Sequence, residues 1–161
     1  MVSEKHKVIS SSGHSFKYQG VFDLNRLYSE MNGWINNNSY DFEEKEHSDK
    51  SKDKGHEIKY VLLGEKKVTD YIKYNVQIEI IAVEVNKMSE NLVSGKLNIV
   101  FNADVELDYK NKWGISRLSK FFFNIYNNYL IKNEIGNHMG KLYDETVDLQ
   151  DLAKDVLDFN K

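Results

Sequence analysis

The chain of 161 residues contains neither cysteine nor proline. Without cysteine it has no disulfide framework, no thiolate zinc site and no catalytic thiol. The lack of cysteine and of an apolar leader segment before Ser12 predicts a cytoplasmic protein. Without proline, its turns must depend on glycine, asparagine, aspartate and serine.

Long apolar runs and a surplus of positive charge are also missing. No segment approaches the roughly 18 consecutive apolar residues that a transmembrane helix needs. The formal net charge is −3, whereas a dedicated nucleic-acid-binding domain normally has a basic surplus. On these grounds we expect neither nucleic acid nor a membrane as the partner of this chain.

The residues that are present predict a single domain of the α+β class. One domain per roughly 150 residues is the usual proportion, so residues 1–161 are expected to form one domain. Hydrophobic residues make up 40% of the chain, which is enough for a core. Alternating polar and apolar residues predict a curved antiparallel sheet of about five strands, accompanied by a short N-terminal helix and a long C-terminal helix.

The expected strands lie within residues 7–18, 40–46, 57–64, 72–85 and 97–109. In the fourth strand the apolar positions change phase at Ile81, which indicates a β-bulge or a strong bend. The stretch from His47 to His56 is rich in Lys, Asp and Ser, a composition typical of an exposed loop.

Two helical patterns complete the chain. Asp23 is a good N-cap, and the spacing of Leu24, Leu27 and Met31 predicts an amphipathic helix over residues 23–35. A long helical pattern follows Gly114. Gly136 and Gly140 lie inside it and indicate a kink or break at that point.

The order of strand, helix, four strands and long C-terminal helix resembles the helix-grip fold of the START-like (SRPBCC) superfamily. The resemblance covers most of the chain and rests on element order, with about five strands where the superfamily has six or seven. The stretch from Asp108 to Trp113 also looks like small uncharacterised archaeal proteins. The superfamily resemblance implies a hydrophobic small molecule held between the sheet and the C-terminal helix.

On this leading hypothesis, the chain is a non-catalytic binding domain whose site lies under the helix. The expected lining residues are Tyr74, Ile78, Phe101, Val105, Phe122, Ile125 and Tyr129. If the sheet is too small to leave a cavity, the same side chains form the core instead.

The run Phe121-Phe122-Phe123 supports an alternative hypothesis. Successive helical side chains are about 100° apart, so three in a row cannot all face one side. The expected second stripe consists of Phe123, Tyr126 and Leu130, with Trp113 at the corner before the helix. Strands, a second copy of the protein or a larger partner would cover such a stripe. The alternative function is therefore an interaction or assembly protein.

Basic residues surround Trp113 in the sequence, namely Lys110, Lys112, Arg117 and Lys120. Basic residues among aromatics can contact RNA or a membrane surface. The acidic remainder of the chain opposes both contacts. The expected role of Trp113 is therefore to close the end of the core.

No constellation in the sequence points to catalysis or to a cofactor. Glycine-rich phosphate loops and the Gly-x-Ser-x-Gly elbow are missing, and the segment Ser10-Ser11-Ser12 before His14 has no obvious acidic partner. An enzyme is the third and least supported hypothesis. It is kept because catalytic sites can assemble from residues that are distant in sequence.

Histidines and carboxylates are expected to be structural or solvated, without a metal. His47 and His56 flank the polar stretch, and the remaining histidines are His6, His14 and His138. Asp104, Glu106 and Asp108 share one face of a strand, where a cation or a lysine of the next strand can neutralise them. We favour a solvated sheet face or pairing with lysines of the neighbouring strand.

Overall fold

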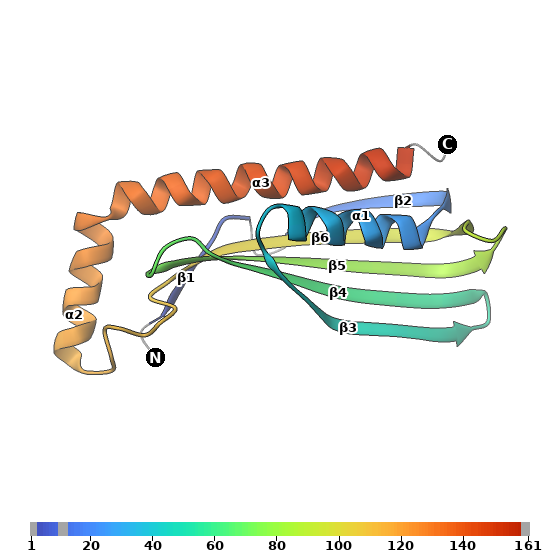
Figure 1. Ribbon diagram of the computed structural model, residues 1–161. Helices are drawn as coiled ribbons and strands as arrows, with labels where there is room; N and C mark the ends of the chain where they lie inside the picture. Colours follow the sequence, from blue (N-terminus) through green and yellow to red (C-terminus); the bar gives the residue numbers. More distant parts are fainter. Residues whose placement is uncertain (1–2, 10–12, 159–161) are drawn as a thin grey trace.

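The computed structural model describes residues 3–9 and 13–158. It has α+β architecture, with an antiparallel sheet covered on one face by helices (Figure 1), which confirms the predicted fold class. The sheet has six strands rather than about five. The elements in order are β1 (Glu4–Lys7), β2 (His14–Phe22), α1 (Leu24–Asn37), β3 (Asp41–Lys52), β4 (Gly55–Lys67), β5 (Ile72–Lys87), β6 (Val93–Leu107), α2 (Arg117–Ile125), the π-helix η1 (Tyr126–Leu130) and α3 (Lys132–Asp158).

Strands β3, β4, β5 and β6 form a continuous antiparallel series, and the last of them pairs with two short strands at its other edge. Strand β2 runs beside residues 93–101 of β6, and β1 runs beside residues 104–107. The serines of the segment 10–12, which lie between β1 and β2 in the sequence, are outside the described residues.

Alternation in the two longest strands separates a helix-covered face from an outer face. Across the β5–β6 pair, Ile78 lies opposite Phe101 and Tyr74 opposite Val105, all of them buried beneath the helices. On the outer face, the Lys73 ammonium lies 3.1 Å from the Glu106 carboxylate. This is cross-strand pairing with lysine, one of the two arrangements that the sequence favoured over a bound cation.

The bulge in β5 lies later than the phase change at Ile81 suggested. Burial continues on alternate residues as far as Ala82 and then shifts to Val85, while the register with β6 changes between Val83 and Asn86. Glu84 has φ of 54°, which places the extra residue there. Ile81 is therefore an apolar residue on the outer face, not the start of a new phase.

The prediction of a loop from His47 to His56 is wrong. Strand β3 continues to Lys52, a two-residue turn follows, and β4 begins at Gly55. Strand β3 is at the edge of the sheet and pairs only with β4 among the described strands. Its backbone hydrogen bonds hold it extended, and an edge strand needs few apolar side chains.

Helix α1 forms where the sequence predicts it. The Asp23 carboxylate accepts a hydrogen bond from the Arg26 backbone N–H at 2.9 Å, which caps the first turn. Leu24, Leu27 and Met31 are buried beneath it. Their spacing places α1 against the helix-covered face of the sheet, beside α3 (Figure 1).

The C-terminal helical pattern is divided, but not where the glycines predicted. Helix α3 runs without interruption through Gly136 and Gly140, and the helical path breaks at Ile131, where φ and ψ are −115° and 12°. A Cβ added at either glycine would meet no neighbouring atom, so both face open space. A glycine at an exposed helical position lowers the stability of the helix but does not break it.

Candidate functional site

The residues predicted to line a ligand site divide into two groups. Tyr74, Ile78, Phe101 and Val105 are completely buried and belong to the main hydrophobic cluster with α1 and α3. They pack as core, which is the second outcome that the sequence allowed. Their contacts with side chains of both helices fill the space beneath α3.

Phe122, Ile125 and Tyr129 do not reach the sheet. Phe122 is 48% exposed and Tyr129 is 80% exposed, while Ile125 is partly buried. The physical reason is the break at Ile131: α2 turns sharply away from α3 and lies beyond the end of the sheet (Figure 1). The expected lid is therefore a separate arm of the molecule.

The predicted interface stripe is also divided. Phe123 is only 4% exposed, and Tyr126 is partly buried between Tyr71 and Trp113, with ring centroids 5.4 Å and 5.6 Å away. Leu130 alone of the stripe is largely exposed, at 72%. The side of the helix expected to meet a partner therefore faces mostly toward the protein.

A joint of polar and aromatic contacts holds α2 and η1 in this position. The Tyr71 hydroxyl donates to Asn127 Oδ1 at 2.7 Å, and both side chains are at least partly buried. Burial raises the pKa of Tyr71 to about 12. Sequence reasoning missed this joint because Tyr71 lies in the turn between β4 and β5, far from α2 in sequence.

The loop before α2 is built around Asp108. Its buried carboxylate accepts hydrogen bonds from the backbone N–H groups of Lys112, at 2.7 Å, and Trp113, at 3.1 Å. Asp108 itself has φ of 53°, so it leaves the strand pattern and turns the chain. Asp108 therefore belongs to a turn and not to the row of outer-face carboxylates in which the sequence placed it.

Exposed apolar side chains concentrate on this arm. Among the described residues, eight large apolar side chains are exposed, and six of them lie between residues 115 and 130. Those six, which we call the α2 face, are Ile115, Leu118, Phe121, Phe122, Tyr129 and Leu130. They are about two-thirds exposed on average. At ~150 Å² per large side chain, the α2 face presents on the order of 600 Å², the upper end for a typical monomer.

The α2 face lies in a strongly basic segment. Residues 109–133 contain five cations and no carboxylate, so the rest of the chain has a formal charge of −8 against the total of −3. Lys110 pairs with Asp70. Arg117, Lys120 and Lys132 are exposed, and none of them forms an ion pair with a described carboxylate.

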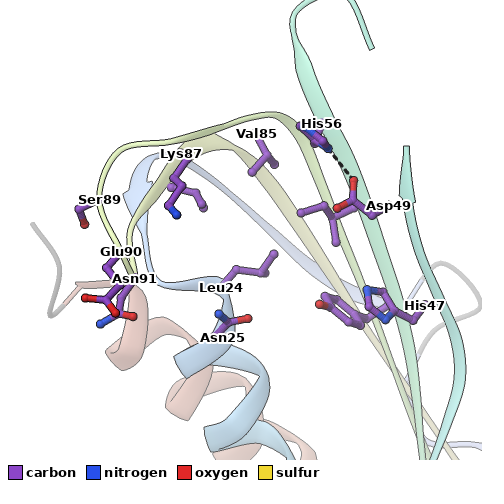
Figure 2. Close-up of a pocket in the computed structure, with 13 residues that line it drawn as sticks. Leu24, Asn25, His47, Asp49, His56, Val85, Lys87, Ser89, Glu90 and Asn91 are labelled. Carbon is purple, nitrogen blue, oxygen red and sulfur yellow. Dashed lines mark hydrogen bonds and ion pairs between the residues drawn. The ribbon is translucent and has the colours of Figure 1, made fainter. Parts of the chain in front are cut away.

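A cleft opens at the opposite end of the helix-covered face, between the start of α1 and the ends of β3, β4 and β5 (Figure 2). Its volume is about 420 Å³. The His47 ring stacks on Tyr60 with centroids 4.4 Å apart, and His56 Nδ1 lies 2.7 Å from Asp49 Oδ1. Leu24 and other apolar side chains complete the lining.

The cleft can bind but offers little for catalysis. His56 and Asp49 are each about half exposed, so water weakens their interaction. Within residues 3–9 and 13–158, no group of three or more His, Asp or Glu side chains is arranged to hold a metal ion. Stacking on His47 and hydrogen bonding to the His56–Asp49 pair fit a small planar polar molecule.

The other three histidines have structural partners. His6 lies 3.4 Å from Glu4, and the His14 ring meets the edge of Tyr143. His138 lies on α3, and its Nδ1 is 2.6 Å from the hydroxyl of Tyr74 on the sheet beneath, within hydrogen-bonding distance. The place of His138 between Gly136 and Gly140 predicts a residue of the surface or of a kink, and this prediction is wrong, because the ring reaches inward from an unbroken helix.

Comparison of the chain with protein-family models, with curated proteins and with solved structures finds no match. In the described part of the chain, no helix combines the length and the apolar character that crossing a membrane requires. Arguments about function therefore rest on the α2 face and the cleft.

Proposed function

We propose that this chain is a non-catalytic docking module that binds a larger partner through the α2 face. The observation that carries the proposal is the concentration of six exposed large apolar side chains on one arm of the molecule. Exposed apolar area of this size costs free energy in water, and covering it by a partner removes that cost.

The joint beneath the arm supports the same proposal. Phe123 and Asn127 are buried on the inner side of the arm, and the Tyr71–Asn127 hydrogen bond fixes its orientation. The apolar side chains are therefore presented in one arrangement before any partner arrives. Such preorganisation lowers the entropic cost of association.

Site-specific photocrosslinking tests this function without requiring a known partner. A benzophenone amino acid replaces Leu118 on the α2 face or, as a matched control, Met88 in the turn after β5; the two side chains are 66% and 61% exposed. Irradiation in the native cell should give discrete adducts from position 118 and only background from position 88. Equal adduct formation at both positions would contradict the proposal.

The cleft is a second candidate site, supported by the stacked His47–Tyr60 pair and the His56–Asp49 pair at its wall. We propose that it holds a small planar polar molecule. A thermal-shift screen of such compounds tests this, with His47→Ala as the variant that removes the stacking surface. A hit that stabilises the wild type and the variant equally would place the binding site elsewhere.

A further inference from the structure

We propose that the partner of the α2 face is the surface of an anionic lipid bilayer. This inference rests on the proposed docking function and names the occupant. It reverses the expectation drawn from the net charge. Summed over the chain, the acidic residues outnumber the basic ones, but residues 109–133, which include α2, contain five cations and no carboxylate.

The apolar side chains of α2 are arranged for contact with a bilayer. Leu118, Phe121, Phe122 and Ile125 recur at spacings of three and four residues and therefore project from one side of the helix. Phe123 projects from the other side, into the protein. A helix with its aromatic side outward is able to lie in the plane of a bilayer, with those rings among the upper acyl chains.

The segment that contains the α2 face is basic. Arg117 and Lys120 lie on α2 and Lys132 begins α3, and no carboxylate occurs from residue 109 to residue 133. A protein surface usually mixes both signs of charge, whereas the head groups of an anionic bilayer have one. Within residues 109–133 the apolar stripe is accompanied by cations alone, with Asp70, which pairs with Lys110, and Glu134 outside that segment. This combination suits both the acyl chains and the head groups of an anionic bilayer.

The position of the arm allows a flat surface to reach it. Helix α2 stands at one end of the molecule, and its outer side is covered by no other described element (Figure 1). The exposed side of α3 is acidic through Asp144, Asp148, Asp151, Asp155 and Asp158. An anionic surface repels that side and attracts the arm, so the charges also select one orientation.

Vesicle flotation with the full chain tests the inference. The vesicles are phosphatidylcholine, either alone or with about 30 mol% phosphatidylglycerol, which supplies the anionic charge. We expect flotation with the anionic vesicles only, and its loss when the salt rises from about 0.1 M to about 1 M, because the screening length falls from ~10 Å to ~3 Å.

Paired variants separate the α2 face from general effects of charge. Leu118→Glu and Lys120→Glu should each weaken binding by about tenfold or more, since the first removes apolar contact and the second reverses a surface charge. Met88→Glu and Lys52→Glu introduce the same changes at exposed positions far along the chain and should bind like the wild type. Circular dichroism confirms that each variant is folded.

The outcomes distinguish this inference from the function beneath it. If anionic vesicles do not bind while position 118 crosslinks to a protein, the membrane inference is overturned and the docking function stands. If vesicles do not bind and position 118 gives no adduct, both fail. Self-association or binding to single-stranded RNA that Leu118→Glu abolishes, without vesicle binding, would also overturn the membrane inference.

Discussion

Two adjacent phenylalanines provide a direct test of how α2 is oriented. Phe123 is 4% exposed and Phe121 is 58% exposed, although both occupy the same helix. Replacing either with alanine removes the same atoms and makes the same change in helix propensity. The difference between the two variants in free energy of unfolding therefore isolates the effect of burial.

The expected difference is large. Truncation of a buried phenylalanine costs about 3–5 kcal/mol, and we expect ~3 kcal/mol for Phe123→Ala because one side of the arm is in solvent. Phe121 has less than half of its surface buried, so Phe121→Ala should cost ~1 kcal/mol or less. In a chain of this size these values correspond to reductions in Tm of roughly 6–12 °C and below ~4 °C.

Urea denaturation followed by circular dichroism measures both free energies. In a Trp34→Phe background, where Trp113 is the sole tryptophan, its fluorescence reports the joint itself. Equal destabilisation by the two variants would refute the assigned orientation of α2. A larger effect from Phe121→Ala would mean that the helix packs through the side we describe as exposed, which would also remove the basis of the docking function.

Three further predictions concern α3 and the sheet beneath it. Gly136→Ala and Gly140→Ala should each raise the free energy of unfolding by ~0.5–1 kcal/mol, measured by urea denaturation, because both glycines are helical and face open space. His138→Ala should cost ~1–3 kcal/mol by leaving the buried Tyr74 hydroxyl without its partner, and a double-mutant cycle with Tyr74→Phe should show that the two losses are not additive. Burial, aided by the Glu145 carboxylate, raises the pKa of Tyr74 to about 12. The neutral phenol is thus favoured in the folded state, and the resulting stability is complete below pH ~10 and declines as the pH rises toward ~12. The urea midpoint of the wild type should therefore fall more between pH 9 and pH 11 than that of Tyr74→Phe; equal decreases would contradict the shift.

Sequence reasoning predicted the central strands and α1 well because one face of each is buried. In β6, alternation from Leu97 to Leu107 leaves a single consistent register. In α1, the Asp23 cap and the apolar spacing agree. Strand β3 has no such pattern, because an edge strand is specified mainly by the backbone of its neighbour. Its residues therefore resemble those of a loop.

The candidate site was harder to predict for two physical reasons. Periodicity showed that the helix after Ser116 has two apolar sides, but it does not state which side meets the protein. The hydrogen bond between Tyr71 and Asn127, which are distant in sequence, determines which side of the helix is buried. No glycine or proline stands at the break at Ile131, so the sequence pattern predicts one long helix that includes the arm.

Net charge is a weak guide to the partner of a chain for a related reason. It is an average over the chain and contains no information about position. The cations of residues 109–133 were visible in the sequence, as was Trp113 among them. Only the fold separates this segment from the acidic side of α3.

The edge strand β3 also determines how this protein avoids unwanted assembly. It leaves one row of backbone hydrogen-bonding groups unpaired by any described strand, and such a row can template the growth of a sheet from other molecules. Proline, a common block at such edges, does not occur in this chain. Eight of the twelve residues of β3 are charged, so mutual repulsion and hydration keep the edges of separate molecules apart. Its five carboxylates and three lysines give β3 a formal charge of −2, and protonation of the carboxylates in acid leaves the lysines positive. Repulsion between edges is therefore weakest at the intermediate acidic pH where the two signs balance, and aggregation there should begin at β3.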